Sequence, residues 1–307
     1  MRRLFVLTPC VNAERYIDGT IQSIVSQSGD FSVRYHIQDG GSTDGTVGKI
    51  EQWADRLKRG HWPLFCRELE FTYLSSRDEG LYDAINKGFS ACAGDAPDES
   101  VMTWINAGDR LEQGALQAIT SIGRAFPDMT WLSGNFAQIN DEGSAVFCRT
   151  GGTAYSKKAI NAGLYEGRLL GFIQQEGSFW SLGLWRANGG RIDPALKRAG
   201  DFDLWRRFAA HAECARVNAI TGFFRQHAGG LSSDRDAYYK EIDALLGADG
   251  RMRRDNVIKE LQDVMARRDI AGLLANGLSG TVVTWNMVTG RWERAIEPIK
   301  AQWPRID

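Results

Sequence analysis

An apolar strand pattern runs directly into a glycine-rich turn and then a helix pattern in Arg34-Tyr35-His36-Ile37-Gln38-Asp39-Gly40-Gly41-Ser42-Thr43-Asp44-Gly45-Thr46. Ser42 or Thr43 can cap the helix, which is predicted to reach about Arg59. Glycines let the backbone approach a ligand closely, and an Asp at the end of a strand can accept a hydrogen bond from the N–H of a nucleotide base. The same residues also fit an ordinary strand-to-helix turn with a capping Ser.

The segments around this stretch repeat the alternation of strand and helix. Strand patterns occur at Leu4–Thr8, Phe71–Leu74, Val101–Ile105 and Trp131–Asn135, and helix patterns at Ala13–Gln27, Leu81–Ala91 and Glu112–Ala125. This alternation predicts an α/β fold with a parallel sheet that helices cover on both faces. In such sheets ligands bind beyond the carboxyl ends of the strands. Four polar loops are expected at that edge: Thr8–Asn12, Asp39–Asp44, Ser75–Gly80 and Asn106–Asp109.

Composition narrows the class of protein. The 307 residues are 43% hydrophobic and carry a net charge of -1, which gives no overall attraction to nucleic acid or to an anionic membrane. No apolar run approaches the roughly 20 residues that span a bilayer. The five cysteines are odd in number and lack C-x-x-C spacing, so neither a disulfide framework nor a zinc site is expected. A reducing cytoplasm fits this pattern.

Two segments carry acids that suit catalysis. Asp109 follows a predicted strand, where a carboxylate can coordinate a divalent cation beside a diphosphate, although an Asp there can also cap a helix. Asp201 and Asp203 open a predicted helix. One of them can act as a general base on a hydroxyl group, whereas acids in a first helical turn also stabilise the helix dipole.

The order and spacing of these segments resemble family 2 glycosyltransferases with the GT-A fold, of the kind that builds bacterial surface polysaccharides. The resemblance covers roughly Arg3 to Ser232 and rests on Leu7–Glu14, Ile21–Gln27, Asp39–Thr46, Asp78–Gly88, Asn106–Asp109, Phe179–Trp180 and Gly200–Trp205. It implies an α/β fold whose Rossmann-like mixed central sheet binds a nucleotide. It also implies an inverting transfer of sugar from a nucleotide-diphosphate donor, UDP-linked in the typical case, to a saccharide or lipid-linked acceptor.

The resemblance places the donor on the first half of the chain. Asp39 is expected to bind the base, and Lys87 to neutralise phosphate or reach solvent. The other residues expected to line the nucleotide-sugar site are Thr8, Pro9, Asn12, Glu14, Asp78, Gly80, Asp83, Asn86, Asn106, Ala107 and Gly108. Asp83 and Asn86 share one helix face, so a joint role is geometrically consistent.

The resemblance also implies Mn²⁺ or Mg²⁺ as cofactor, held by Asp109. Asn106 replaces the first acid of the family's metal motif, so the diphosphate and water are expected to supply most of the coordination. His227 is a second candidate for the metal or the diphosphate, and a structural role is the alternative for it.

The second half of the chain is expected to bind the acceptor. Asp201 stands at the family's position for the general base, with Asp203 as the competing candidate, and Gly200 replaces an acid that many members carry. Gln175 and Glu176 either contact the acceptor or donor sugar or are ordinary polar residues of a loop. Trp180 either stacks on a sugar ring or belongs to the core.

Three other classes are weighed against this interpretation. The first strand is not followed by the G-x-G-x-x-G of a dinucleotide-dependent oxidoreductase, nor by the basic glycine-rich loop of a nucleotidyltransferase. A non-catalytic nucleotide-sugar-binding or scaffold protein is the main alternative, because the metal motif is weakened.

The predicted organisation is a catalytic domain at 1–232, with a nucleotide-binding half (1–110) and an acceptor-binding half (111–232), and a helical extension at 233–307. The extension is expected to pack on the catalytic domain, with peripheral attachment to the inner face of the membrane or an oligomer contact as alternatives.

Overall fold

The computed structural model describes residues 3–149, 153–226 and 234–300. The strands are β1 Arg3–Cys10, β2 Gly29–Asp39, β3 Cys66–Ser75, β4 Val101–Trp104, β5 Arg110–Leu111, β6 Trp131–Asn135, β7 Ala137–Ile139, β8 Ala145–Cys148, β9 Ser178–Ser181, β10 Ala215–Ile220, β11 Gly222–Arg225, β12 Ser279–Asn286 and β13 Arg291–Pro298. The helices are α1 Ile17–Val25, α2 Thr46–Lys58, α3 Leu81–Ala93, α4 Ala115–Ala125, α5 Lys157–Asn161, the short 3₁₀ helix η1 Gln175–Gly177, α6 Leu182–Ala187, α7 Gly200–His211, α8 Arg235–Ala266 and α9 Ile270–Ala275.

Within the described residues, nine strands form one mixed sheet in the order β13-β12-β10-β6-β9-β4-β1-β2-β3. Strands β3, β2, β1 and β4 run parallel. Strand β9 inserts antiparallel between β4 and β6, and β13 is antiparallel to β12. A second sheet joins β5, β11, β7 and β8. The α/β fold class predicted from the sequence is confirmed.

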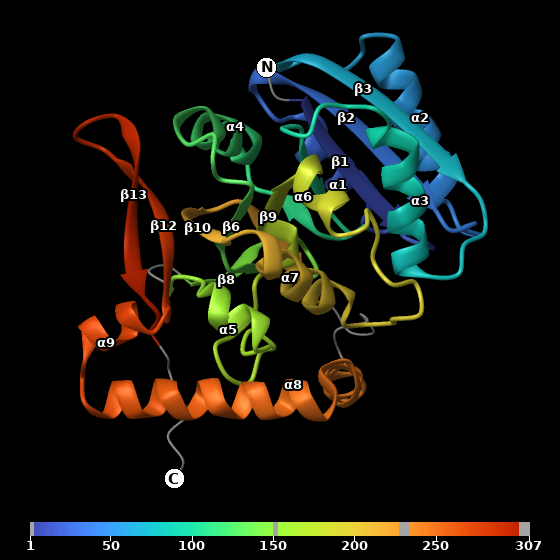
Figure 1. Ribbon diagram of the computed structural model, residues 1–307. Helices are drawn as coiled ribbons and strands as arrows, with labels where there is room; N and C mark the ends of the chain where they lie inside the picture. The colour runs from blue at the N-terminus through green and yellow to red at the C-terminus, as the bar shows by residue number, and fades with distance from the viewer. Residues whose placement is uncertain (1–2, 150–152, 227–233, 301–307) are drawn as a thin grey trace.

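The alternation of side chains along β1 explains the two-faced core. Leu4 and Val6 pack in one hydrophobic cluster with residues of α1, α2 and α4, whereas Phe5 and Leu7 pack in the other with residues of α3 and α7. Successive side chains of a strand point to opposite faces, so a strand covered on both sides is apolar throughout. Figure 1 shows these helices on the two sides of the sheet.

The part of the chain after residue 233 is helical, as expected, only as far as Ala275. It begins with α8, which bends at Gly247, where φ is 59°. It ends in the hairpin β12–β13, which stands at the left of Figure 1 and extends the main sheet. The hairpin was not predicted, although its β-branched run Thr281-Val282-Val283-Thr284 is typical of a strand. The boundary at 232/233 stays a prediction.

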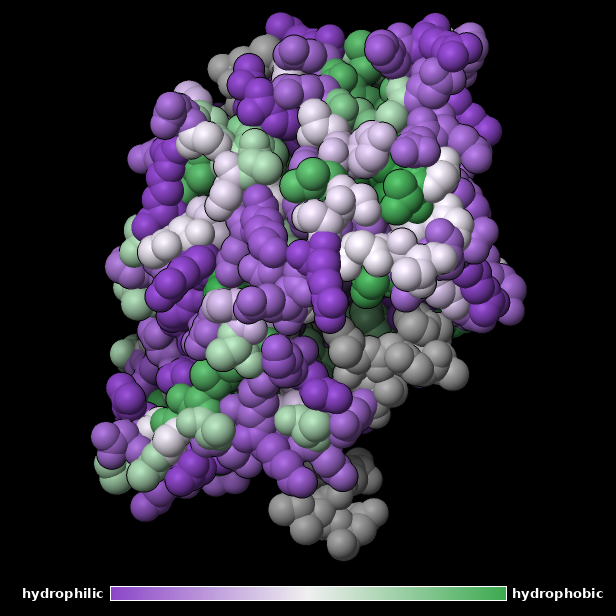
Figure 2. All heavy atoms as spheres, turned by 90° about the vertical axis from the view of Figure 1, so that its right-hand side faces the viewer, coloured by the Kyte–Doolittle hydropathy of each residue, from purple (hydrophilic) through white to green (hydrophobic). Residues whose placement is uncertain are grey.

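The surface carries no continuous apolar region on the face shown in Figure 2, where hydrophobic residues are scattered among hydrophilic ones. None of the helices in the described ranges is long and apolar enough to cross a membrane. All five cysteines are free thiols.

Candidate active site

The carboxyl ends of the parallel strands bring the predicted loops together. Cys10 of β1 lies opposite Asp39 of β2, and Asp39 lies opposite Ser75 of β3. On the other side of β1, the N–H of Ala107 donates to the carbonyl of Pro9 at 3.4 Å. The four polar loops therefore start from one edge of the sheet, as the sequence predicted.

Asn12 and Glu14 hold the glycine-rich turn. Asn12 Oδ1 accepts from the N–H of Thr43 at 2.9 Å, and its own N–H donates to Ser42 Oγ at 2.7 Å. Glu14 Oε2 accepts from the N–H of Gly45 at 3.1 Å. Thr8 lies within β1, where it is buried and hydrogen-bonds to the hydroxyl of Tyr35. These residues fix the shape of the expected nucleotide pocket through protein contacts.

Asp39 is buried and already has several hydrogen-bond donors. Its Oδ2 accepts from the N–H groups of Gly41 and Ser42 and from Ser75 Oγ, at 3.1, 3.0 and 2.6 Å. Burial alone would raise the pKa of Asp39, but the hydrogen bonds from Ser42 and Ser75 outweigh it and hold the pKa below its usual value. A nucleotide base that bonds to Asp39 has to share or displace these donors.

The segment at residues 78–88 follows β3 and forms the next part of the expected donor site. Asp78 Oδ1 accepts from the N–H of Gly80 at 2.9 Å, and a side chain at Gly40 would lie 2.5 Å from Asp78 Oδ2. The carboxylate of Asp83 pairs with Lys87 at 2.7 Å, which lowers the pKa of Asp83. Asn86 bonds through both ends of its amide to the backbone of Ile192, at 2.8 and 2.9 Å. Asn86 therefore ties α3 to the loop that leads into α7.

The loop that carries Asp109 is fixed from two sides. The hydroxyl of Thr20 on α1 donates to the carbonyl of Asp109 at 2.8 Å and accepts from the N–H of Gly108 at 2.9 Å. Arg225 on β11 donates its N–H to Asp109 Oδ1 and its Nε–H to the carbonyl of Gly108, both at 2.7 Å. This contact of Arg225 was not predicted from the sequence.

Asp109 and Glu176 form a buried pair of acids. Asp109 is 5% exposed and Glu176 is 6% exposed, and their carboxyl groups hydrogen-bond to each other. Burial raises the pKa of both, and the charge of Asp109 further raises that of Glu176. Asn106 Nδ2 completes the cluster with hydrogen bonds to Asp109 Oδ2 and Gln175 Oε1, each at 3.2 Å. Glu176 was expected near a sugar, and nothing in its sequence spacing pointed to Asp109.

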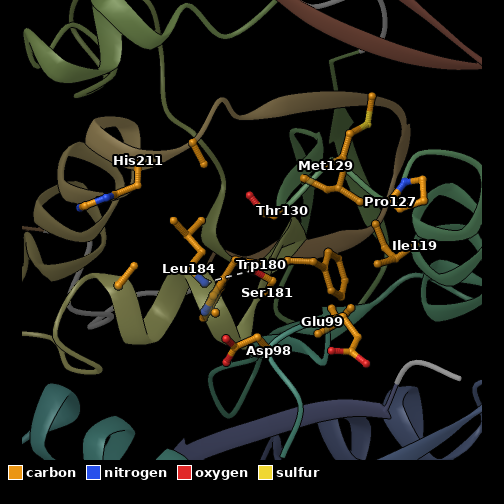
Figure 3. Close-up of a pocket in the computed structure, with 16 residues that line it drawn as sticks. Asp98, Glu99, Ile119, Pro127, Met129, Thr130, Trp180, Ser181, Leu184 and His211 are labelled. Atoms are coloured by element: carbon orange, nitrogen blue, oxygen red, sulfur yellow. Dashed lines mark hydrogen bonds between the residues drawn. The ribbon is translucent and has the colours of Figure 1, made fainter.

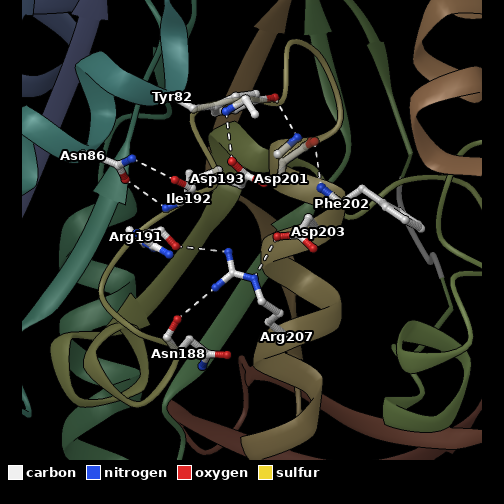
Figure 4. A network of polar contacts seen from close by, with 12 residues as sticks. Tyr82, Asn86, Asn188, Arg191, Ile192, Asp193, Asp201, Phe202, Asp203 and Arg207 are labelled. Atoms are coloured by element: carbon white, nitrogen blue, oxygen red, sulfur yellow. Dashed lines mark hydrogen bonds and ion pairs between the residues drawn. The ribbon is translucent and has the colours of Figure 1, made fainter. Parts of the chain in front are cut away.

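Asp201 is half-buried in the first turn of α7, and its negative charge contributes to the raised pKa of Glu176. Asp201 Oδ1 accepts from the N–H of Phe202 at 2.8 Å. The hydroxyl of Tyr82 accepts from the N–H of Gly200 at 2.9 Å, so α3 contacts the start of α7 (Figure 4). Burial raises the pKa of Asp201 to about 6.

The competing candidates are engaged elsewhere. Asp203 pairs with Arg207 one turn along α7 at 2.8 Å, and Arg207 also donates to the carbonyls of Asn188 and Arg191 (Figure 4). Trp180 is 1% exposed and packs against Trp104, Trp185 and Trp205. With no free ring face, Trp180 belongs to the core rather than to a sugar site. Gln175 is buried and donates to the carbonyl of Trp104. His227 lies outside the described residues.

A separate cavity of about 460 Å³ opens at the amino ends of β4 and β6. Its lining includes Asp98, Thr130 and His211, with Trp180 along one wall (Figure 3). It lies at the sheet edge opposite to the loops of Asp39 and Asp109, so it is not the expected donor site.

Comparison with known proteins agrees with the fold. Residues 5–122 match the model of the family Glycosyl transferase family 2. No curated protein sequence matches the chain. Among solved structures, the 1–349 fragment of TarS from S. aureus aligns with a TM-score of 0.54 and 16% identity over 81% of this chain and 66% of that one.

Two ligand complexes are similar to the same degree. The TarS fragment in complex with UDP-GlcNAc aligns with a TM-score of 0.56 and 17% identity, over 81% of this chain and 68% of that chain. The mannosyltransferase PcManGT from Pyrobaculum calidifontis, in complex with GDP-Man and Mn²⁺, aligns with a TM-score of 0.52 and 16% identity over 90% and 80% of the two chains. The family model covers the loops of Asp39, Asp83 and Asp109, and the solved structures share the fold, so residues 5–122 are similar to a glycosyl transferase family 2 domain and the chain has a GT-A-like fold.

Proposed function

We propose that this protein is an inverting glycosyltransferase, which moves a sugar from a UDP-linked donor to a hydroxyl group of a saccharide or lipid-linked acceptor in surface polysaccharide synthesis. The proposal is carried by one observation: the buried carboxyl groups of Asp109, in the loop between β4 and β5, and of Glu176 on η1 lie against each other, and the charge of Asp201 on α7 acts on Glu176. A cation held by the two acids can assist departure of the nucleoside diphosphate, and Asp201 can take the proton of the acceptor hydroxyl.

The cluster suits a divalent cation. Two buried carboxyl groups in contact repel each other when both are ionised, so they need a proton or a cation between them. Asp109 and Glu176 would hold the ion, and Asn106 lies beside them. In the described ranges no third His, Cys, Asp or Glu joins the group, so the donor diphosphate and water would complete the coordination. A bound Mn²⁺ or Mg²⁺ would neutralise charge on the departing nucleoside diphosphate.

Asp201 would take the proton from the acceptor hydroxyl. A carboxyl group with a pKa of about 6 is mostly ionised at neutral pH and still basic enough to accept a proton as the hydroxyl attacks. Attack on the face of the sugar opposite to the diphosphate gives one in-line displacement with inversion. The step leaves a neutral acid on Asp201 and a nucleoside diphosphate as product, without a covalent intermediate on the protein.

The proposed donor and metal are supported by the ligands bound in two similar structures. TarS was solved with UDP-GlcNAc and PcManGT with GDP-Man and Mn²⁺. We favour UDP because the Asp39 turn carries the residues that resemble the uracil-binding turn of the family.

The proposal is tested with UDP-GlcNAc, UDP-glucose and GDP-mannose in the presence of Mn²⁺, with release of nucleoside diphosphate as the signal. We expect slow hydrolysis of one UDP-sugar by the wild type, no turnover by Asp201→Asn, and donor binding retained in that variant. Asp203→Asn is the matched control, because it removes an acid from the same helical turn, and it should stay active. Turnover by Asp201→Asn would show that another group is the base.

The alternative is a non-catalytic nucleotide-sugar-binding protein, which the replacement of an acid by Asn106 favours. Tight donor binding without turnover of any donor, with and without saccharide acceptors, would support it. The buried contact of Glu176 with Asp109 weakens this alternative, since it restores a second acid to the site.

A further inference from the structure

A single side chain of the C-terminal part holds the start of α7. Glu241 lies on α8, and its carboxylate accepts three backbone hydrogen bonds: Oε1 from the N–H of Lys197 at 2.8 Å, and Oε2 from the N–H groups of Arg198 and Ala199 at 2.8 and 2.6 Å. Helix starts leave backbone N–H groups without helical partners. Ala199 is the N-cap of α7 and has no side chain that can accept a hydrogen bond. Glu241 therefore supplies from another helix the cap that the sequence of α7 lacks.

The contact is held from both sides. Arg198 pairs with Asp234 at 3.2 Å, and Asp234 in turn caps α8 by accepting from the N–H of Ala237. Next to Glu241, a small hydrophobic cluster joins α8 to the start of α7 through Ala199, Phe202, Ile242 and Leu246. A charged hydrogen bond to backbone N–H groups is about twice as strong as a neutral one, so the carboxylate fixes this backbone closely.

Asp201 lies two residues after Ala199, the last of the three residues whose N–H groups Glu241 binds. The backbone just before Asp201 is held at Gly200 by the hydroxyl of Tyr82 on α3 and at Ala199 by Glu241 on α8. The structure therefore assigns Glu241 as a positioning residue: we propose that it fixes the backbone that carries the general base, which makes α8 a functional part of the active site. This inference rests on the proposed role of Asp201. It lies outside residues 5–122, which match the family model.

The test compares Glu241→Gln with Glu260→Gln. Glu260 also joins α8 to the rest of the protein, through Lys158 at 2.6 Å, but its partner is on α5. Each substitution removes one charged side chain through which α8 contacts the rest of the protein. Only Glu241 contacts the backbone at the start of α7. With the UDP-sugar that the wild type hydrolyses fastest among the three named above, we expect Glu241→Gln to lower kcat at least about tenfold and to leave the donor KM unchanged, since small misplacements of a catalytic group cost large factors in rate.

A second readout separates positioning from folding. Hydrogen exchange of the amides at 197–199 should become faster in Glu241→Gln and stay at the wild-type rate in Glu260→Gln, while both variants keep the wild-type melting temperature within a few degrees. The acid limb of the rate–pH profile should also move to lower pH in Glu241→Gln, because the charge of Glu241 raises the pKa of Asp201. The other ionisable groups near Asp201 are Tyr82, Tyr238 and Glu176, and all three are intact in both variants.

Equal loss of kcat in the two variants, or unchanged kcat in Glu241→Gln despite faster exchange at 197–199, would overturn the inference and leave the proposed function standing. Wild-type turnover that survives in Asp201→Asn would overturn the proposed base first, and the positioning role with it.

Discussion

Asp201 is half-buried, and it must be ionised to act as the general base. The rate of the reaction should therefore depend on pH. Burial disfavours the carboxylate and raises its pKa to about 6. The base is active above this pKa and protonated below it. We expect kcat to be flat above about pH 7 and to fall about tenfold for each pH unit below 6. A profile measured from pH 4.5 to 8 with saturating donor that stays flat down to pH 5 would exclude Asp201 as the base.

Asp109 and Glu176 should stabilise the protein only when a cation lies between them. An acid whose pKa is raised in the folded state lowers stability as the pH rises through that pKa, because the native state then holds a buried charge that the unfolded state solvates freely. We expect Glu176→Gln, without metal at pH 8, to melt at or above the wild-type temperature. With Mn²⁺ and UDP the order should reverse, since ligand at 100 times Kd stabilises by about 2.7 kcal/mol. If Mn²⁺ and UDP raise the melting temperature of Glu176→Gln as much as that of the wild type, Glu176 does not hold the ion.

Asp109, Asp201 and Glu176 show which features of the candidate site could be predicted from the sequence and which could not. Asp109 and Asp201 could be proposed as site residues because one follows the end of a predicted strand and the other opens a predicted helix. The position of Glu176 against Asp109 was not predicted, because it depends on η1 crossing beside the end of β4, a contact between segments far apart in the chain. The two possibilities kept for Trp180 were resolved by the antiparallel insertion of β9, which places its side chain among the core aromatics.

At the level of elements, the contact between α3 and α7 explains a departure from the family pattern. Gly200 stands where many members carry an acid. In this chain a Cβ atom at position 200 would lie 2.5 Å from the ring of Tyr82. That ring belongs to the 78–88 signature and is itself buried. The glycine is therefore a consequence of how closely α3 approaches the helix of the base.

This packing gives an element-level prediction. Gly200→Ala should lower the free energy of unfolding by about 1–3 kcal/mol through overpacking and should lower kcat, because the start of α7 must shift. The double variant Gly200→Ala/Tyr82→Leu should recover part of the stability lost in Gly200→Ala, relative to Tyr82→Leu alone. Denaturant titrations of the four proteins measure the coupling between the two positions. Strictly additive changes would mean that Tyr82 and Gly200 do not restrain each other.

For the whole molecule, the strands of the first half follow their predicted positions closely, whereas the C-terminal part does not. The first half is built from strand–helix units in which each local pattern agrees with its place in the sheet. The hairpin β12–β13 pairs instead with β10, through Val282 and Val283 beside Arg216 and Val217. No local pattern records that pairing, since a strand's partner depends on the order of strands in the whole sheet.

The hairpin closes the main sheet, so the extension should be required for folding as well as for catalysis. Val283 and Leu278 are fully buried, and Trp292 donates its Nε1–H to Ser121 Oγ on α4 at 2.7 Å. A Cβ atom at Gly280 would lie 2.1 Å from the carbonyl of Tyr155, so β12 lies directly against the catalytic part.

A chain that ends at Asn276 should lose these contacts and expose the apolar edge of β10. We expect its circular dichroism signal to show no cooperative unfolding transition. The double variant Met287→Ser/Val288→Ser changes only the exposed tip of the hairpin and should stay within about 0.5 kcal/mol of the wild type. Cooperative melting of the shortened chain near the wild-type temperature would instead establish residues 1–276 as an independent fold.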